Sequence, residues 1–233
     1  MKTKICGITR LEDAEAAVEA GAWGIGLNHS PQSKRCIDLA EAERIGAAMK
    51  RRCEIAGIFV NQTLDGVAEA AEREGLTIVQ LHGDEGPTFC AEVARRTGCR
   101  IAKAFRVRSP ADITAARAFR VDFHLFDAYV RGHPGGTGAT FDWDLVARRK
   151  GGVPAILAGG LTPDNVGDAV AVANPWGVDV SSGVESAPGI KDHNLIVSFL
   201  AAADRAGVIQ REERVRRRAL KRVRRAVAGR TRS

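Results

Sequence analysis

A thiol and a carboxylate, two groups that can exchange protons, each end a short apolar stretch of the chain. Cys6 ends the stretch Lys4–Cys6, and Asp127 ends the stretch Phe123–Asp127. A thiol acts as a base only if neighbours lower its pKa or the proton it takes is acidic, and a carboxylic acid donates only if its pKa is raised, for instance by burial. The pair predicts acid–base chemistry. The alternatives are that Cys6 is a small buried hydrophobe and that Asp127 caps a helix or pairs with a basic neighbour.

Three further titratable residues lie within or directly after the apolar stretches and are alternative acids or bases. Asp179 lies between two valines, which favours a supporting or structural role. His82 is compatible with two interpretations: it contacts the substrate, or it lies at the rim of the site with its hydrogen bonds made within the protein. Lys103 lies in the stretch Arg100–Ala104.

Two segments late in the chain are suited to holding a phosphate. Gly159 and Gly160 lack side chains, so backbone N–H groups can approach an anion, while Ser181, Ser182 and Gly183 offer hydroxyls and amides where a short helix could begin. The alternative is that both segments are tight turns that need glycine.

The elements that must position these residues alternate with a period of about 25 residues, the length of a βα unit. Apolar stretches predict strands at Lys4–Cys6, Trp23–Leu27, Ile55–Val60, Ile78–Leu81, Arg100–Ala104, Phe123–Asp127, Ala155–Ala158 and Gly177–Val180. Helical patterns lie at about 11–20, 39–52, 63–74, 87–97, 109–119, 142–149, 163–173 and 191–206. The first helix is expected to begin at an N-cap, Thr9, and to end at a C-cap, Gly21. Eight βα units predict a closed (β/α)8 TIM barrel, whose active face lies at the carboxyl ends of its strands.

Composition is typical of an α/β protein in a reducing compartment. The chain has 45% hydrophobic residues, 25 glycines and few aromatics, as expected for parallel strands covered by alanine-rich helices. No run approaches the roughly 18 apolar residues of a membrane span, and no signal peptide precedes the first strand, so a soluble cytoplasmic protein is predicted. The five cysteines are scattered, which disfavours both a disulfide framework and a zinc site.

The positive charge is concentrated at one end of the chain. Eleven Lys and Arg residues and two Glu residues follow position 210, so this segment carries +9 and residues 1–210 carry −2 of the overall +7. We therefore expect a catalytic barrel over residues 1–207 and a basic tail, helical or disordered, over 208–233. The tail is compatible with a solvated extension, a weak contact with nucleic acid or an anionic surface, or an oligomer contact.

Nine motifs, in the order and with the spacing of that family over about residues 2–205, resemble phosphoribosylanthranilate isomerase of tryptophan biosynthesis. They are Lys4–Thr9 (KICGIT), Ser33–Arg35 (SKR), Gly57–Asn61 (GIFVN), Gln80–Asp84 (QLHGD), Gly135–Trp143 (GGTGATFDW), Leu157–Leu161 (LAGGL), Asn165–Val166, Val178–Glu185 (VDVSSGVE) and Pro188–Asp192 (PGIKD).

The resemblance implies a cofactor-free, metal-free Amadori rearrangement of N-(5-phosphoribosyl)anthranilate into 1-(2-carboxyphenylamino)-1-deoxyribulose 5-phosphate. Asp127 would be the general acid and Cys6 the general base, Arg35 would hold the anthranilate carboxylate, and the Gly135–Gly138 loop would cover the site. The implied substrate-binding residues are Arg35, His82, Gly136, Gly159, Gly160, Asp179, Ser181, Ser182 and Gly183.

Departures from the family pattern leave alternatives open. The segment Leu27–Pro31 replaces an aromatic-rich stretch, Cys36 stands where an aromatic is usual, and Ala139 replaces a common basic residue. A paralogue acting on a related phosphoribosyl amine is one alternative, and a low-activity barrel that binds partners through its tail is another. A bifunctional isomerase that also serves histidine biosynthesis is a third, although such enzymes carry a carboxylate at the position of Cys6. The resemblance is compatible with a monomer or a homodimer.

Overall fold

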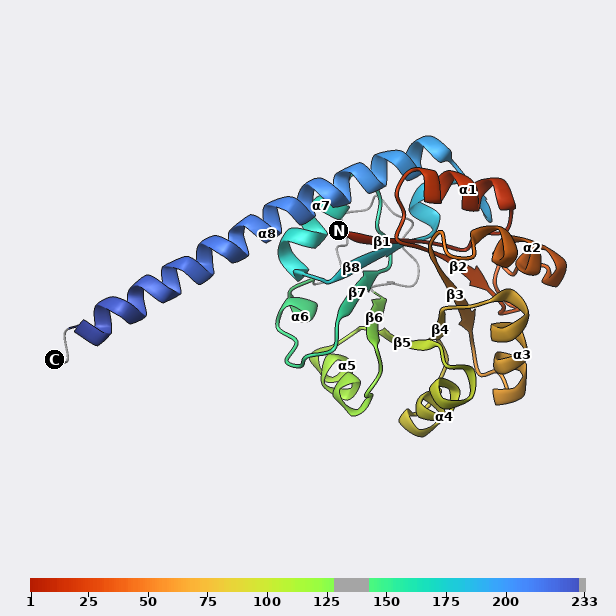
Figure 1. Ribbon diagram of the computed structural model, residues 1–233, viewed down its shortest axis with the longest axis horizontal. Helices are drawn as coiled ribbons and strands as arrows, with labels where there is room; N and C mark the ends of the chain where they lie inside the picture. The colour runs from red at the N-terminus through yellow and green to blue at the C-terminus, as the bar shows by residue number, and fades with distance from the viewer. Residues whose placement is uncertain (128–142, 231–233) are drawn as a thin grey trace.

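Eight parallel strands close into a barrel, with helices around its outside (Figure 1). The structure is a computed structural model that describes residues 1–127 and 143–230, with side chains described as far as Glu212. The strands follow one another around the barrel in chain order, and β1 pairs with both β2 and β8. The predicted (β/α)8 fold is therefore confirmed.

The observed strands agree with the predicted ones to within two residues at each end. The strands are β1 (Lys2–Cys6), β2 (Gly24–Asn28), β3 (Glu54–Phe59), β4 (Ile78–Leu81), β5 (Arg100–Arg106), β6 (Phe123–Asp127), β7 (Ala155–Ala158) and β8 (Gly177–Val180). The α-helices are α1 (Leu11–Glu19), α2 (Leu39–Met49), α3 (Leu64–Glu74), α4 (Pro87–Thr97), α5 (Pro110–Ala115), α6 (Trp143–Ala147), α7 (Val166–Ala173) and α8 (His193–Arg230). Two single-turn 3-10 helices are η1 (Ala116–Ala118) and η2 (Ser182–Val184), and a small hairpin joins β9 (Glu185–Ala187) to β10 (Ile190–Lys191).

Alternation along the strands separates two apolar regions, because successive side chains of a strand point to opposite faces. Residues on one face, such as Ile5, Ile25 and Val79, pack under the helices in the larger core. Residues on the other face fill the barrel with a smaller cluster of eight buried side chains among the described residues, including Ile78 and Leu125, against which Trp23 and Trp176 pack. The interior is thus packed, and chemistry is confined to its rim.

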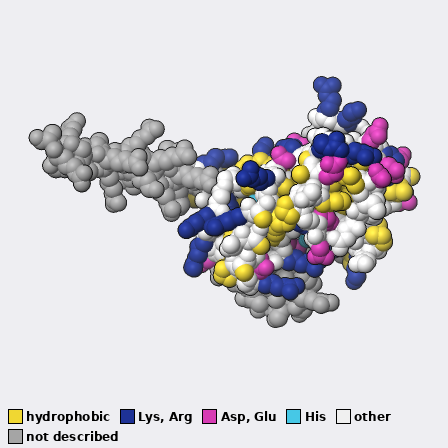
Figure 2. Space-filling view, turned by 90° about the horizontal axis from the view of Figure 1, so that it is seen from below, with side chains coloured by type: hydrophobic (Ala, Val, Ile, Leu, Met, Phe, Trp, Pro, Cys, Tyr) yellow, Lys and Arg dark blue, Asp and Glu magenta, His cyan; other side chains and the backbone are white. Residues whose placement is uncertain are grey.

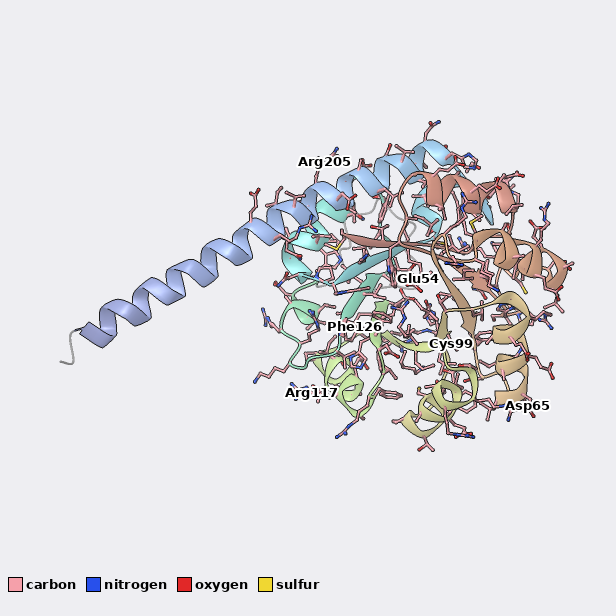
Figure 3. All side chains as sticks on the ribbon, viewed as in Figure 1. Glu54, Asp65, Cys99, Arg117, Phe126 and Arg205 are labelled. Atoms are coloured by element: carbon pink, nitrogen blue, oxygen red, sulfur yellow. The ribbon has the colours of Figure 1, made fainter. Side chains whose placement is uncertain are left out.

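An aromatic cluster closes the amino-terminal end of the barrel. Trp23, Trp176 and Phe123 pack in mutual contact, with ring centroids 5.0 to 5.9 Å apart. The Arg100 guanidinium lies over the Trp23 and Phe123 rings and pairs with Glu54, which is labelled at the start of β3 in Figure 3. This end is therefore sealed by packing and a cation–π contact, which leaves the opposite end for ligands.

Two local predictions for α1 are wrong. Its N-cap is Arg10, with no side-chain cap, while the Thr9 hydroxyl donates to the Gly189 carbonyl oxygen 2.5 Å away. The C-cap is Ala20, and Gly21 follows it with a φ of 96°. Thr9 is drawn to the β9–β10 turn, a contact that only the closed barrel creates.

The last helix, α8, runs without a break through the expected boundary at residue 207. Its buried side chains against the barrel are Ile196, Phe199, Leu200 and Ala203, and the helix then projects away from the body (Figure 1). Within the described residues, none of the helices combines the length and the apolar composition that a membrane crossing requires. On the face drawn in Figure 2, Lys and Arg side chains of the body are interspersed with Asp and Glu.

Candidate active site

A cavity of about 250 Å³ opens at the carboxyl ends of the barrel strands and gathers most of the predicted site residues. Those residues are Cys6, Arg35, His82, Asp127, Gly159, Gly160, Asp179, Ser181 and Ser182. Its wall is completed by Gly7, Asn28, Ile58, Gln80, Ala158, Leu161 and Val180. These predicted residues thus lie together around one cavity, whereas Gly136 and the rest of the Gly135–Gly138 loop lie outside the described residues.

Cys6 ends β1 and is partly buried at the floor of the cavity. Burial and the Asp179 carboxylate raise the pKa of its thiol, and the ammonium groups of Lys4 and Lys191 only partly offset this increase. The resting group at neutral pH is therefore a thiol. To act as a base the thiol must first ionise, so Cys6 can serve only where the proton to be removed is itself acidic.

Asp179 of β8 forms a buried ion pair with Lys4 of β1. Lys4 Nζ lies 2.9 Å from Asp179 Oδ1, and the two side chains are 3% and 7% exposed. Burial would lower the pKa of Lys4, but the Asp179 carboxylate and Cys6 outweigh it and raise the pKa above its ordinary value. Lys4 is therefore a charged ammonium inside the barrel.

Asp127 ends β6 at the rim of the same cavity and contacts His82, which follows β4. His82 Nε2 lies 3.3 Å from Asp127 Oδ2, and His82 Nδ1 lies 3.3 Å from Gln80 Nε2. The imidazole thus links a strand residue, Gln80, to the carboxyl group. Because Gln80 Nε2 donates to Nδ1, the neutral imidazole carries its proton on Nε2 and donates it to Asp127 Oδ2, so the histidine orients the carboxyl group.

Arg35, in the segment between β2 and α2, is held by Glu185 of β9. Arg35 Nε and Nη2 each donate to one Glu185 carboxylate oxygen at 2.7 Å, and Lys191 Nζ of β10 lies 2.8 Å from Oε1. Burial would raise the pKa of Glu185, but its bonds to Arg35 and Lys191 hold it below its usual range. A Cβ on Gly7 would lie 2.5 Å from Arg35 Cδ, so the glycine lets the arginine pass close to the strand end.

The two predicted phosphate segments lie next to each other at the cavity wall. Gly159 and Gly160 have φ values of 89° and 63°, in the left-handed region that favours glycine. Ser181 and Ser182 precede and begin η2, and the Ser181 hydroxyl is buried without a hydrogen-bond partner among the described atoms. Gly183 does not line the cavity; a Cβ there would collide with the Leu161 carbonyl oxygen, so it packs η2 against the loop after β7.

Lys103, held in reserve as an acid or base, lies outside the cavity wall. Its Nζ pairs with Glu85 at 3.0 Å and donates to the carbonyl oxygens of Leu81 and Gly83. His29, from the Leu27–Pro31 segment that departs from the family pattern, does not line the cavity either. Its ring stacks on Phe59, and its Nε2 lies 2.9 Å from the buried Glu74 carboxylate. These residues hold loops and helices in place around the site.

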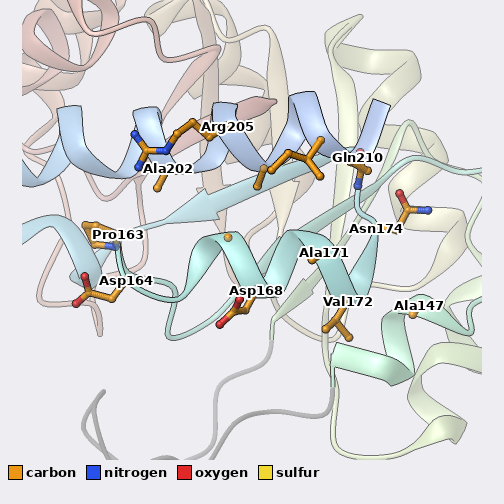
Figure 4. Close-up of a pocket in the computed structure, with 13 residues that line it drawn as sticks. Ala147, Pro163, Asp164, Asp168, Ala171, Val172, Asn174, Ala202, Arg205 and Gln210 are labelled. Carbon is orange, nitrogen blue, oxygen red and sulfur yellow. The ribbon is translucent and has the colours of Figure 1, made fainter. Parts of the chain in front are cut away.

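A larger cavity, of about 840 Å³, lies between α7 and α8 on the outside of the barrel (Figure 4). Its lining is mostly alanine and aliphatic side chains, with Asp164, Asp168 and Arg205 at its edge. It contains none of the predicted site residues. In the part of the chain that the structure describes, no group of three or more His, Cys, Asp or Glu side chains is arranged to hold a metal ion.

Comparison with known proteins identifies the family of the chain. The family model described as N-(5'-phosphoribosyl)anthranilate (PRA) isomerase matches residues 3–202. The chain belongs to the phosphoribosylanthranilate isomerase family. The resemblance inferred from the nine motifs is thereby confirmed.

Curated members of the phosphoribosylanthranilate isomerase family match along almost their whole length. The protein of that name from Geobacter metallireducens is 47% identical over 203 residues, which cover 87% of this chain and 98% of that protein. The one from Myxococcus xanthus is 45% identical, with 87% and 96% covered.

Solved structures of the phosphoribosylanthranilate isomerase family share the fold. The enzyme from Thermotoga maritima superposes with a TM-score of 0.79 at 39% identity, covering 88% of this chain and 98% of that one. A structure of phosphoribosylanthranilate isomerase in complex with reduced 1-(o-carboxyphenylamino)-1-deoxyribulose 5-phosphate gives 0.76 at 38% identity, with the same coverage.

Four residues of the isomerase site escaped the sequence prediction. They are Lys4, Gln80, Glu185 and Lys191. A signal existed for Lys4, because a charged residue stands two positions before Cys6 on an apolar strand and so points to the same side. Glu185 and Lys191 gave no local signal, since their role depends on Arg35, 150 positions away from Glu185.

Proposed function

We propose that the chain catalyses the Amadori rearrangement of N-(5-phosphoribosyl)anthranilate to 1-(2-carboxyphenylamino)-1-deoxyribulose 5-phosphate, the isomerase step of tryptophan biosynthesis. The observation that carries this proposal is that Cys6 and Asp127, from opposite parts of the sequence, line one cavity in a chain 47% identical to curated phosphoribosylanthranilate isomerases.

Asp127 is proposed as the general acid. Its proton goes to the furanose ring oxygen, and the bond from that oxygen to C1 breaks, which leaves a C4 hydroxyl and a protonated imine between C1 and the anthranilate nitrogen. His82, 3.3 Å from Oδ2, holds the carboxyl group in place for this transfer.

Cys6 is proposed as the general base. The iminium beside C2 withdraws electrons and makes the C2 proton acidic. The base is the thiolate form of Cys6, which has lost its own proton to solvent; burial raises the pKa of the thiol, so this form is scarce but strongly basic. Cys6 takes that proton, and the electron pair of the C–H bond forms a C1–C2 double bond while the imine nitrogen becomes neutral. The resulting enol gives up its hydroxyl proton and gains a proton at C1, so the product is a ketone isomeric with the substrate.

The remaining residues are proposed to bind the two ends of the substrate. Arg35 lines the cavity and donates to Glu185 through Nε and Nη2. The remaining N–H groups of its guanidinium are proposed to bind the anthranilate carboxylate. The phosphate is proposed to lie between Gly159–Gly160 and Ser181–Ser182, which line the same cavity and where the buried Ser181 hydroxyl has no hydrogen-bond partner among the described atoms. Cys6 and Asp127 line the same cavity as these two binding regions.

The wider features of the chain stay predictions. We propose a catalytic barrel over residues 1–207 with a basic extension, a cytoplasmic location, and a monomer or homodimer. Of the alternatives, an isomerase that also accepts the histidine-pathway substrate is disfavoured by the thiol at position 6, and turnover of that aminoaldose would be the observation that favours it.

The test follows the loss of anthranilate fluorescence with freshly generated phosphoribosylanthranilate. We expect rapid loss with the wild-type chain and a decrease in kcat of at least about 100-fold in Cys6→Ala and in Asp127→Asn, because each removes one proton transfer. A matched control is Cys36→Ala, an exposed thiol outside the cavity, which should retain activity. Folded wild-type protein without turnover would contradict the proposal and direct attention to related aryl-amine ribosides.

A further inference from the structure

Lys4 and Cys6 lie on the same side of β1. They are two residues apart on a strand, so both side chains point into the barrel. Lys4 pairs in register with Gly24 and with Asp179, whereas Cys6 pairs with Gly26. The lysine therefore lies directly below the thiol, one layer deeper in the barrel.

A glycine in β2 makes room for the two groups to meet. A Cβ on Gly26 would lie 3.0 Å from Cys6 Sγ and 3.1 Å from Lys4 Nζ, so both atoms border the same small space. Lys4 is almost fully buried, and its ion pair with Asp179 holds Nζ beside Gly26. Apart from that ion pair, Nζ has no hydrogen-bond partner among the described atoms, which leaves N–H donors for the sulfur.

We propose that Lys4 is a positioning residue of this site, whose ammonium, held by Asp179, is the counter-charge for the Cys6 thiolate when the thiol acts as a base. This inference rests on the proposed function for its catalytic meaning, but the interaction itself can be measured without the substrate. In this arrangement Asp179 has two opposing effects. It fixes the ammonium in place, and its own negative charge disfavours the thiolate.

The charged groups around Cys6 come from several elements. Asp179 of β8 acts against the thiolate, whereas Lys4 of its own strand and Lys191 of β10 act in its favour. Arg35 is also close enough to the sulfur for the thiolate to raise the pKa of the guanidinium. Across the cavity stand His82 and Asp127. Among these groups Lys4 and Asp179 form an isolated buried pair, so they can be removed together without leaving an unpaired charge.

The test measures alkylation of Cys6 by iodoacetamide, a neutral reagent, as a function of pH, with each cysteine followed separately by peptide mass spectrometry. The proteins are the full wild-type chain, Asp179→Asn, and Asp179→Asn combined with Lys4→Met. The midpoint of the rate–pH curve reports the thiol pKa, whereas altered access changes only the plateau. Exposed Cys36 in the same molecule is the internal control.

The proposal predicts midpoint changes of opposite sign. In Asp179→Asn the Lys4 ammonium has no carboxylate partner and stabilises the Cys6 thiolate alone. The Cys6 midpoint should therefore fall by about one pH unit, which is a tenfold gain in thiolate fraction at pH values below both midpoints. Adding Lys4→Met should reverse this fall completely. The Cys36 midpoint should stay constant throughout.

Two results would overturn the proposal. One is an Asp179→Asn midpoint that does not fall, and the other is a double variant whose midpoint stays as low as that of Asp179→Asn. If the double variant does not fold, Lys4→Gln in the same background replaces it. Because alkylation needs no substrate, the result stands whether or not the chain isomerises phosphoribosylanthranilate, and the fluorescence assay decides that question separately.

Discussion

Single side chains of this site are held by charges that come from distant parts of the chain. Arg35 shows this most clearly, because two 2.7 Å hydrogen bonds to Glu185 hold its guanidinium in place at the cavity wall. A planar, forked cation can bind one carboxylate along one edge and present other N–H groups to a second. An ammonium has no such division of donors.

We therefore expect Arg35→Lys to raise the KM for phosphoribosylanthranilate about tenfold or more, with a smaller effect on kcat, because the lysine cannot serve Glu185 and the substrate carboxylate together. Steady-state fluorescence kinetics measure the two constants separately. Arg44→Lys is the matched control, since Arg44 makes a similar paired contact with Glu41 on an exposed helix surface. Equal KM values for Arg35→Lys and the wild type would show that Arg35 does not bind the substrate.

At this scale, the sequence was informative about residue identity and much less about partners. Cys6, Asp127 and the paired glycines at 159–160 could be found because each follows an apolar strand, and strand ends meet at one face of a barrel. The Lys4–Asp179 pair could not be found, because it depends on the register between the first and last strands. Gly183 was assigned to the site from its neighbours, although its actual constraint is the carbonyl oxygen of Leu161.

Among the elements, α1, β10 and α8 are joined at a single carboxylate, Asp13. The side chain is completely buried and accepts hydrogen bonds from Arg10 Nε and Nη2 at 3.0 and 2.8 Å and from the Lys191 amide at 3.2 Å, while His193 Nε2 lies 2.9 Å away. Burial would raise the pKa of Asp13, but Arg10 and His193 outweigh it and hold the pKa below its ordinary value.

We expect Asp13→Ala to lower the free energy of unfolding by about 2 kcal/mol at pH 7, because it leaves the buried Lys191 amide without an acceptor and removes the charged contacts with Arg10 and His193. The carboxylate binds protons less readily in the folded state, so its contribution is present above the unfolded pKa, near 4, and is lost as pH falls through the lower folded pKa. Urea unfolding at pH 7, 5 and 3 should therefore show a difference between wild type and variant that shrinks on acidification.

The control for that series is Glu12→Ala, which removes a pair with the same arginine at an exposed position. Its effect should stay within about 0.5 kcal/mol at every pH, as for other surface ion pairs. An Asp13→Ala effect that is equally small, or that grows on acidification, would contradict the role assigned to Asp13.

The elements themselves were predictable where periodicity was long enough to be seen. Strands β4, β6, β7 and β8 and helix α4 have the predicted bounds. The β9–β10 hairpin was missed because strands of three and two residues carry no periodic signal, and its turn depends on Gly189 at a φ of 82°. The Thr9 cap failed for a related reason, since its partner belongs to that same turn.

In the whole molecule, the barrel and the end of α8 differ in how they are supported. Gly207 is the last buried residue among the described side chains of α8, and Arg211 and Glu212 are exposed. The chain from residue 211 onward carries +9, whereas residues 1–210 carry −2.

We propose on this basis that residues 211–233 are dispensable for catalysis. A chain ending at Gln210 should retain kcat and KM and unfold within about 0.5 kcal/mol of the full chain, because the residues removed follow the last buried position. Fluorescence kinetics and urea unfolding test this expectation. Loss of turnover on truncation would contradict the division of the chain. Salt-dependent binding to RNA, compared between the two lengths, tests the nucleic-acid alternative separately.

The pairing of β1 with β8 also has a consequence for the protein during its synthesis. The first strand obtains its second neighbour only when residues 177–180 have been made, so one edge of β1 stays open while most of the chain is translated. At elongation rates of roughly 5–20 residues per second, this wait lasts about 10–35 s. Throughout that interval one edge of β1 lacks its partner, and unpaired strand edges are the kind of surface that pairs with other chains. Slower translation should therefore increase the yield of aggregated protein.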